Sequence, residues 1–186
     1  MKKINIIMIA AIFAVTMSGI AFAEEAPQKV FDLAKSKFTE IGKKPVIIKA
    51  VKAANAERKS LSSIQELDEK WKAKAGIADY MQVLMDNACG KYLRDLQNAE
   101  PYIAEAFAMD NQGANVCITG KTSDYWQGDE NKFVISFNRG KGGVFVDQVE
   151  FDDSTQINVS QVSVPVMEGE KVIGAITFGV DVDKLN

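Results

Sequence analysis

The chain of 186 residues contains no histidine, and this absence excludes several functional classes at once. Serine–histidine and cysteine–histidine nucleophile systems, haem attachment through Cys-x-x-Cys-His, and the usual zinc sites all require it. The sequence also lacks a glycine-rich phosphate loop, and it has only two cysteines and four prolines. Most enzyme mechanisms that use a general base are therefore removed.

Long hydrophobic runs are equally scarce, with a single one at residues 4–21. Lys2 and Lys3 precede this run, and Ala21-Phe22-Ala23 follows it with the small-x-small pattern of a signal peptidase site. We expect residues 1–23 to be a signal peptide cleaved after Ala23, which places the mature protein in the periplasm. The alternative is an uncleaved membrane anchor, since nearly 20 residues can just span a bilayer.

Basic residues are scarce in the second half of the mature chain. Residues 24–186 carry 20 basic and 25 acidic groups, a net charge of −5, and residues 101–186 carry 6 basic against 13 acidic groups. Binding to nucleic acid requires clustered Lys and Arg, so the sequence predicts no nucleic-acid partner.

The mature sequence divides into a helical half, residues 24–100, and a strand-rich half, residues 101–186, which we expect to form one domain. Apolar residues recur at helical spacing in four stretches. The expected helices are residues 30–41, 46–57, a short one opened by the capping box Ser63-Ile64-Gln65-Glu66, and a long one at 77–97. The expected strands are residues 102–109, 114–119, 144–151, 155–166 and 172–182, with a short helix near 130–137.

Two strands of the second half carry acids on otherwise apolar faces. In the last strand, Ala175, Thr177, Gly179 and Asp181 share a face of small residues that leaves room beside the sheet. In an earlier strand, alternation places Asp147 beside Phe145, Val149 and Phe151. Either Asp147 lies at an exposed strand end, or Asp147 or Asp181 meets a polar or cationic ligand group in a concave site.

The loop at residues 122–130 has two adjacent aromatic residues, Tyr125 and Trp126, among polar neighbours. They suit the lid of a ligand site, and they suit equally a plug at the open end of the core.

Residues 101–186 resemble the single Cache (PAS-like extracytoplasmic) sensor domains of bacteria. The resemblance is carried by Phe107-Ala108-Met109-Asp110-Asn111-Gln112-Gly113, by Ser123-Asp124-Tyr125-Trp126-Gln127-Gly128-Asp129, and by Val164-Pro165-Val166 with the strand from Val172 to Asp181. It implies an α+β fold with long N-terminal helices on one side of a five- or six-stranded antiparallel sheet and a ligand pocket on the other, and the five expected strands fit the smaller number.

The same resemblance implies that Phe145 and Asp181 flank the amine of a ligand. The helix after the loop reads Asn131-Lys132-Phe133 and lacks the Arg with which relatives bind an α-carboxylate, which puts an α-amino acid ligand in question. The expected ligand-binding residues are Tyr125, Trp126, Phe133, Phe145, Asp147, Thr177 and Asp181. No second span follows Asp181, so we expect a separate membrane-bound receptor or kinase as partner. Homodimerisation through the N-terminal helices is left open.

We expect Cys89 and Cys117 to form one disulfide in an oxidising compartment, and the alternative is two separate buried thiols. Glu150, Asp152 and Asp153 could hold calcium, but a solvated acidic turn is the simpler interpretation, and no metal or cofactor is expected.

Three functions follow from these patterns: a sensor domain for a small organic ligand, an accessory subunit that binds proteins and no ligand, and an enzyme using Asp147 and Asp181 as an acid–base pair. The sequence favours the first.

Overall fold

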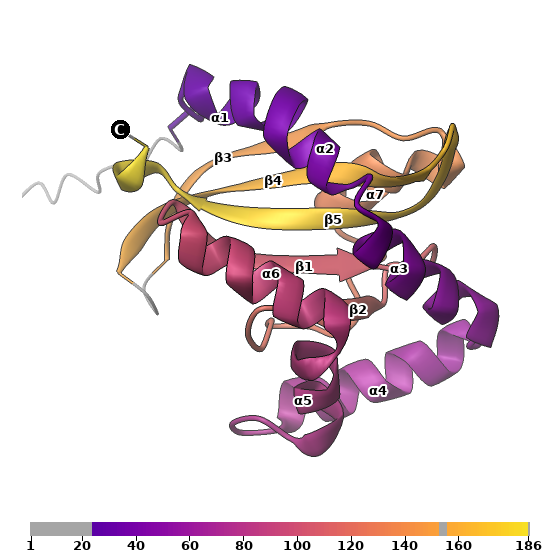
Figure 1. The fold of residues 1–186 in the computed structure, drawn as a ribbon. Coiled ribbons are helices and arrows are strands. Elements are labelled where there is room, and N and C mark those ends of the chain that lie inside the picture. Colours follow the sequence, from indigo (N-terminus) through magenta and orange to yellow (C-terminus); the bar gives the residue numbers. More distant parts are fainter. Residues whose placement is uncertain (1–23, 153–155, 186) are drawn as a thin grey trace, which may run out of the picture.

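The computed structural model describes residues 24–152 and 156–185; the expected signal peptide and Asp153 of the acidic turn lie outside them. Long helices cover one face of a five-stranded antiparallel sheet, as predicted (Figure 1). The helices are α1 (Gln28–Leu33), a π-helical turn (Ala34–Phe38), α2 (Thr39–Ile41), α3 (Pro45–Glu57), α4 (Leu61–Ala73), α5 (Asp79–Asp86), α6 (Ala88–Ala99) and α7 (Asn131–Phe137). The strands are β1 (Ile103–Met109), β2 (Asn115–Ile118), β3 (Phe145–Asp152), β4 (Ile157–Glu168) and β5 (Lys171–Asp181), in the order β2-β1-β5-β4-β3. None of the helices in this part of the chain combines the length and hydrophobicity needed to cross a bilayer.

The start of α4 differs from the predicted capping box. The helix begins at Leu61, and the hydroxyl of Ser60 accepts the amide of Ser63 at 3.2 Å, so Ser60 is the N-cap. Glu66 lies one turn further on and pairs with Lys70 at 2.7 Å instead of reaching back to the N-cap. The prediction failed because several serines in a row offer alternative caps of equal chemistry.

The predicted long helix at residues 77–97 is broken into α5 and α6. Asn87 adopts an extended conformation with ψ 166°, and its side chain accepts the amide of Gly90 at 2.8 Å, which caps α6. A side chain at Gly90 would lie 2.3 Å from the carbonyl oxygen of Met85, so only glycine allows this close approach. Hydrophobic periodicity continues across the break because α5 and α6 both face the interior, and periodicity alone therefore missed it.

One face of the sheet packs against α1, the π-helical turn, α2, α3 and α6. In Figure 1, α3 and α6 lie in front of the sheet and α7 lies behind it. Phe38 and Phe178 stack at the centre of this interface with ring centroids 4.1 Å apart, and both are fully buried. Ile176, Val180 and Val164 belong to the same cluster, which confirms that the bulky side of the last strand faces helices.

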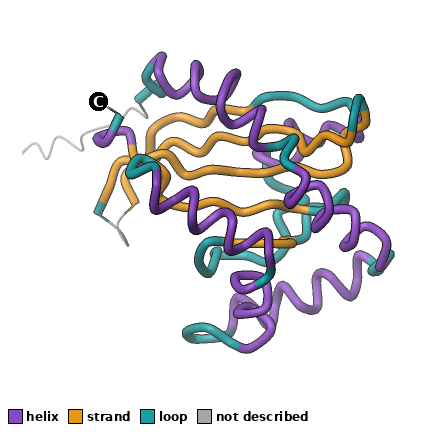
Figure 2. Tube along the Cα trace, viewed as in Figure 1, coloured by secondary structure: helices purple, strands orange, loops and turns teal. Residues whose placement is uncertain are grey.

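A second apolar cluster lies beyond β1 and β2 and joins the sheet to α4, α5 and α7. Trp71 of α4 and Met81 of α5 are fully buried in it, together with Phe107 and Met109 of β1. Figure 2 shows how loops connect these helices and strands at this end of the sheet.

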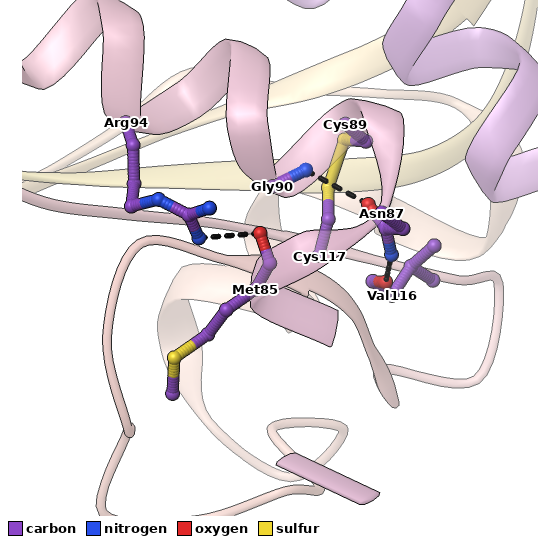
Figure 3. The surroundings of a disulfide bond; sticks show 7 residues. All are labelled: Met85, Asn87, Cys89, Gly90, Arg94, Val116 and Cys117. Carbon is purple, nitrogen blue, oxygen red and sulfur yellow. Dashed lines mark hydrogen bonds between the residues drawn. A yellow bond between two sulfur atoms is a disulfide. The ribbon is translucent and has the colours of Figure 1, made fainter. Parts of the chain in front are cut away.

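The predicted disulfide between Cys89 and Cys117 is present and joins α6 to β2 (Figure 3). Both cysteines are buried. Next to the bridge, the side-chain amide of Asn87 donates to the carbonyl of Val116 at 3.0 Å, and Arg94 donates to the carbonyl of Met85. The disulfide and the Asn87–Val116 hydrogen bond therefore hold the helical half to the sheet at the same place, and the Arg94 hydrogen bond joins α6 to α5.

Candidate functional site

The open face of the sheet carries a row of polar residues across its three central strands. Glu105 of β1 and Gln161 of β4 are both register partners of Gly179 on β5, which lies between them. Because Gly179 has no side chain, its neighbours reach across it, and the Gln161 amide donates to Glu105 Oε1 at 3.3 Å. A Cβ atom at position 179 would lie 2.6 Å from Cγ of Glu105. The sheet therefore offers a polar floor where an aliphatic residue would otherwise stand.

A cleft of about 500 Å³ opens above this floor. Its volume falls within the range of small-molecule sites in proteins. Its lining comes from β1, β3, β4 and the start of α7: Ala104, Glu105, Glu130, Lys132, Asp147, Gln148, Glu150, Phe151, Asp152, Ile157, Val159 and Gln161. A neighbouring hollow shares Glu130, Lys132, Asp147 and Gln161 with it, so these four residues form the junction of one continuous recess.

Lys132 is a charged residue on the wall of this cleft, and only 8% of its surface is exposed. Its ammonium pairs with Glu130 at 2.8 Å, donates to Oε1 of Gln161 at 3.1 Å, and lies 5.6 Å from the centroid of the Phe107 ring. A buried charge requires such partners. The contacts fix the ammonium at the mouth of the site, where it orients the Gln161 amide toward Glu105.

Glu105 is half-buried, and its carboxylate accepts only the Gln161 hydrogen bond among the described residues. Burial raises the pKa of Glu105, and the positive charge of Lys132 and the Gln161 bond offset this shift only in part. The cleft therefore contains a carboxylate whose charge is incompletely compensated within the protein.

A bulge in β3 places Asp147 in the cleft. Val146 pairs with Val162, and Val149 pairs with Ser160, so Asp147 and Gln148 together face the single residue Gln161. The carbonyl of Asp147 accepts the Ser160 hydroxyl at 2.8 Å, and its carboxylate accepts the amide of Gln148. The extra residue reverses the alternation of the strand. The expectation that Phe145, Asp147, Val149 and Phe151 share one face is therefore wrong, since Val149 packs with the helices.

Tyr125 and Trp126 do not roof a common hollow. Tyr125 is 3% exposed, and its ring centroid lies 5.6 Å from that of Trp71. Tyr125 also contributes to the wall of a separate cavity of about 380 Å³ between α3 and the α5–α6 pair. Trp126 donates its indole N–H to the carbonyl of Gln112 at 2.8 Å and lines another cavity near α4. Asp68 holds the loop by accepting both backbone amides at 2.8 and 3.0 Å. In this structure the two rings close the end of the second apolar cluster.

The other residues expected to bind a ligand are not among those that line the cleft. Thr177 is fully buried and shares a 2.5 Å hydrogen bond with Ser163, whose register partner on β3 is Phe145. Phe133 is buried and stacks on Phe137 of the same helix at 5.2 Å. Asp181 pairs with Lys184 at 2.8 Å and accepts the amide of Asp183, so its carboxylate is occupied by the turn after β5. Of the seven predicted residues, Asp147 alone lines this cleft.

Glu105, Lys132 and Gln161 are the cleft residues that the sequence prediction missed. Glu105 is a lone acid in the apolar strand Ile103-Ala104-Glu105-Ala106-Phe107, which is the same signal that drew attention to Asp147. Gln161 and Lys132 carry no such signal, because a polar residue in an alternating strand or at a helix start usually faces solvent. Their role depends on contacts between β4 and α7.

No family model matches the chain, and no curated protein matches it by sequence. The search of solved structures finds sensor domains. The sensory domain of the Campylobacter jejuni chemoreceptor Tlp3 is 14% identical, with a TM-score of 0.42, and the alignment covers 83% of this chain and 63% of that one. The sensor domain of the V. cholerae histidine kinase DctB is 10% identical, with a TM-score of 0.37 and coverages of 84% and 58%.

A third similar structure is the ligand-binding domain of the Pseudomonas fluorescens chemoreceptor CtaA in complex with L-serine, at 10% identity, a TM-score of 0.38 and coverages of 86% and 63%. The chain spans 58–63% of the length of these three solved domains. At TM-scores below 0.5, the alignments establish neither a ligand nor a partner for this chain.

Proposed function

We propose that this protein is an extracytoplasmic sensory domain that holds a small organic ligand in the cleft above Glu105, Gly179 and Gln161. The observation that carries the proposal is the combination of a ligand-sized recess with a polar floor and a buried ammonium at its edge. Small-molecule sites share this design, in which a few oriented polar groups stand in a concave wall.

Export to the periplasm is part of the proposal. The signal-peptide pattern of residues 1–23 and the Cys89–Cys117 bridge both suit an oxidising compartment. A separate membrane-bound receptor or kinase would receive the signal, by analogy with the chemoreceptor and kinase domains that the structure resembles.

Binding without chemical transformation is the third part. The acid–base pair considered from the sequence, Asp147 and Asp181, does not meet in one cavity: Asp147 lines the cleft and Asp181 is held by Lys184. General acid–base catalysis needs both groups within reach of the same substrate.

A thermal-shift screen of the mature protein against amines, amino acids, carboxylates and purines tests the proposal. A ligand at 100 times its Kd stabilises the native state by about 2.7 kcal/mol, which raises Tm by about 5–10 °C in a domain of this size. We expect at least one class to give such a saturable shift. No shift from any class would favour the accessory-subunit function, and turnover of a bound compound would favour an enzyme.

Matched variants then locate the site. Asp147→Ala and Gln161→Ala should abolish the shift, whereas Asp124→Ala, which changes an acid of the cavity beside Trp126, should retain it. Asp181→Ala tests the ligand-binding role that the sequence predicted for Asp181. This variant should lose the shift only if the ligand reaches the end of β5. A shift that survives Asp147→Ala and Gln161→Ala would place the ligand elsewhere.

A further inference from the structure

The cleft is strongly unbalanced in charge. Its lining includes five carboxylates and one ammonium. These are Glu105, Glu130, Asp147, Glu150 and Asp152 against Lys132. Lys132 is committed to Glu130 and Gln161 and so does not offer a free cation to a ligand anion. An anionic ligand would have to enter a recess that already has excess negative charge in walls of low dielectric.

Glu105 is the carboxylate beside which a ligand would place its positive charge. It stands on the floor of the cleft, and no Lys or Arg among the described residues lies within ion-pair distance of it. An ammonium group placed above Gly179 would compensate a carboxylate that the protein leaves without a counter-ion.

The arrangement of the acids distinguishes an organic cation from a metal ion. Metal ions such as calcium require several oxygen ligands that converge on one point. Within residues 24–152 and 156–185, no group of three or more acidic side chains is close enough to hold a metal ion. The carboxylates come instead from β1, β3 and the start of α7, spread around the recess. Separated acids suit an organic molecule that presents N–H groups of positive charge at separate positions.

We propose that the ligand of this cleft is a small organic cation bearing one or more protonated amines, with one amine bound at Glu105. This inference rests on the proposed function, because it specifies the ligand of the same site. Glu105 and Asp147 accept hydrogen bonds from N–H groups of the ligand. Gln161 keeps Glu105 in place, and the side-chain oxygen of Gln161 accepts a hydrogen bond from Lys132.

Calorimetric titration with three four-carbon probes tests the charge requirement. The probes are 1,4-diaminobutane, 1,4-butanediol and succinate, which share a chain length and differ in charge. We expect the diamine to bind and the other two to bind at least about tenfold more weakly, since a hydrogen bond between charged groups is worth about one to two orders of magnitude in affinity. Raising the salt concentration should weaken diamine binding.

Glu105→Gln should weaken diamine binding about tenfold to a hundredfold, and the control Glu66→Gln, which removes an exposed acid on α4, should change it less than twofold. Thermal melts of both variants establish that they are folded, and Asp147→Asn gives a second change in the same cleft. Equal binding of diol and diamine, stronger binding of succinate, or displacement of the diamine by micromolar calcium would overturn the inference.

The outcome also separates this inference from the proposed function. If a neutral or anionic compound binds and Gln161→Ala abolishes its binding, the site stands and the cationic ligand is refuted. If no probe and no member of the wider panel binds, both proposals fail.

Discussion

The two faces of the sheet are formed by the same strands but carry different kinds of side chain. On the helix-covered face, Ile176, Phe178 and Val180 of β5 are fully buried against α1–α3 and α6. On the other face, Thr177 and Gly179 of the same strand lie beside Ser163, Gln161 and Glu105. The second apolar cluster, with Phe107, Met109 and Ala175, covers one end of this second face, and the polar end around Gly179 is left available for a binding site.

Removing the aromatic stack of the covered face should give the largest effect. Phe178→Ala deletes a fully buried ring that stacks on Phe38, and we expect a loss of about 3–5 kcal/mol in the free energy of unfolding. The measurement is urea denaturation followed by circular dichroism. Phe151→Ala is the control, because this ring at the rim of the cleft is 55% exposed and its loss should cost less than about 1 kcal/mol. Equal losses would contradict the division between the two faces.

Removing the disulfide should cost slightly less. Cys89 and Cys117 are 28 residues apart, so the double variant to alanine should lose about 3–4 kcal/mol by the entropy of the unfolded chain. Reduction of the wild-type protein should give a similar loss in the same denaturation assay. Two reactive thiols in the denatured, unreduced protein would contradict the bridge.

The hydrogen bond between Ser163 and Thr177 tests the polar face directly. Thr177→Val leaves a buried hydroxyl at Ser163 without its partner, and we expect a loss of about 1–3 kcal/mol. Ser163→Ala combined with Thr177→Val removes both hydroxyls and should recover part of that loss. A double variant as unstable as the sum of the single ones would show that the two hydroxyls are not coupled.

The smallest effect on stability should come from Glu105→Gln, and it should depend on pH. A carboxyl group whose pKa is raised by folding contributes stability below its ordinary, unfolded pKa, and this contribution is lost as the pH rises through the raised folded value. The variant should therefore match the wild type near pH 4 and be more stable at pH 7. Melting temperatures at the two pH values measure the difference. A variant less stable than wild type at pH 7 would contradict an uncompensated charge.

Local signals in the sequence predicted much of the fold. The strands expected at residues 102–109 and 114–119 leave Asp110–Gly113 between them, where Asp and Gly suit a tight turn, and Gly113 indeed has φ +85° while Asp110 accepts the backbone amides of Gln112 and Ala114. The break at Asn87 and the bulge at Asp147 were missed, because both keep the local hydrophobic pattern while changing the direction of the chain.

The sequence by itself determined the order of helices and strands, the covered face of β5 and the absence of histidine chemistry, because each depends on residue type or short-range periodicity. Only the tertiary structure decided which polar side chains meet. Glu105, Lys132 and Gln161 lie on three different elements, and they form one site because Gly179 leaves space between β1 and β4 and because α7 packs against β3, β4 and β5 and brings Lys132 to Gln161. Contacts between residues distant in the chain depend on the packing of elements, which no local pattern encodes.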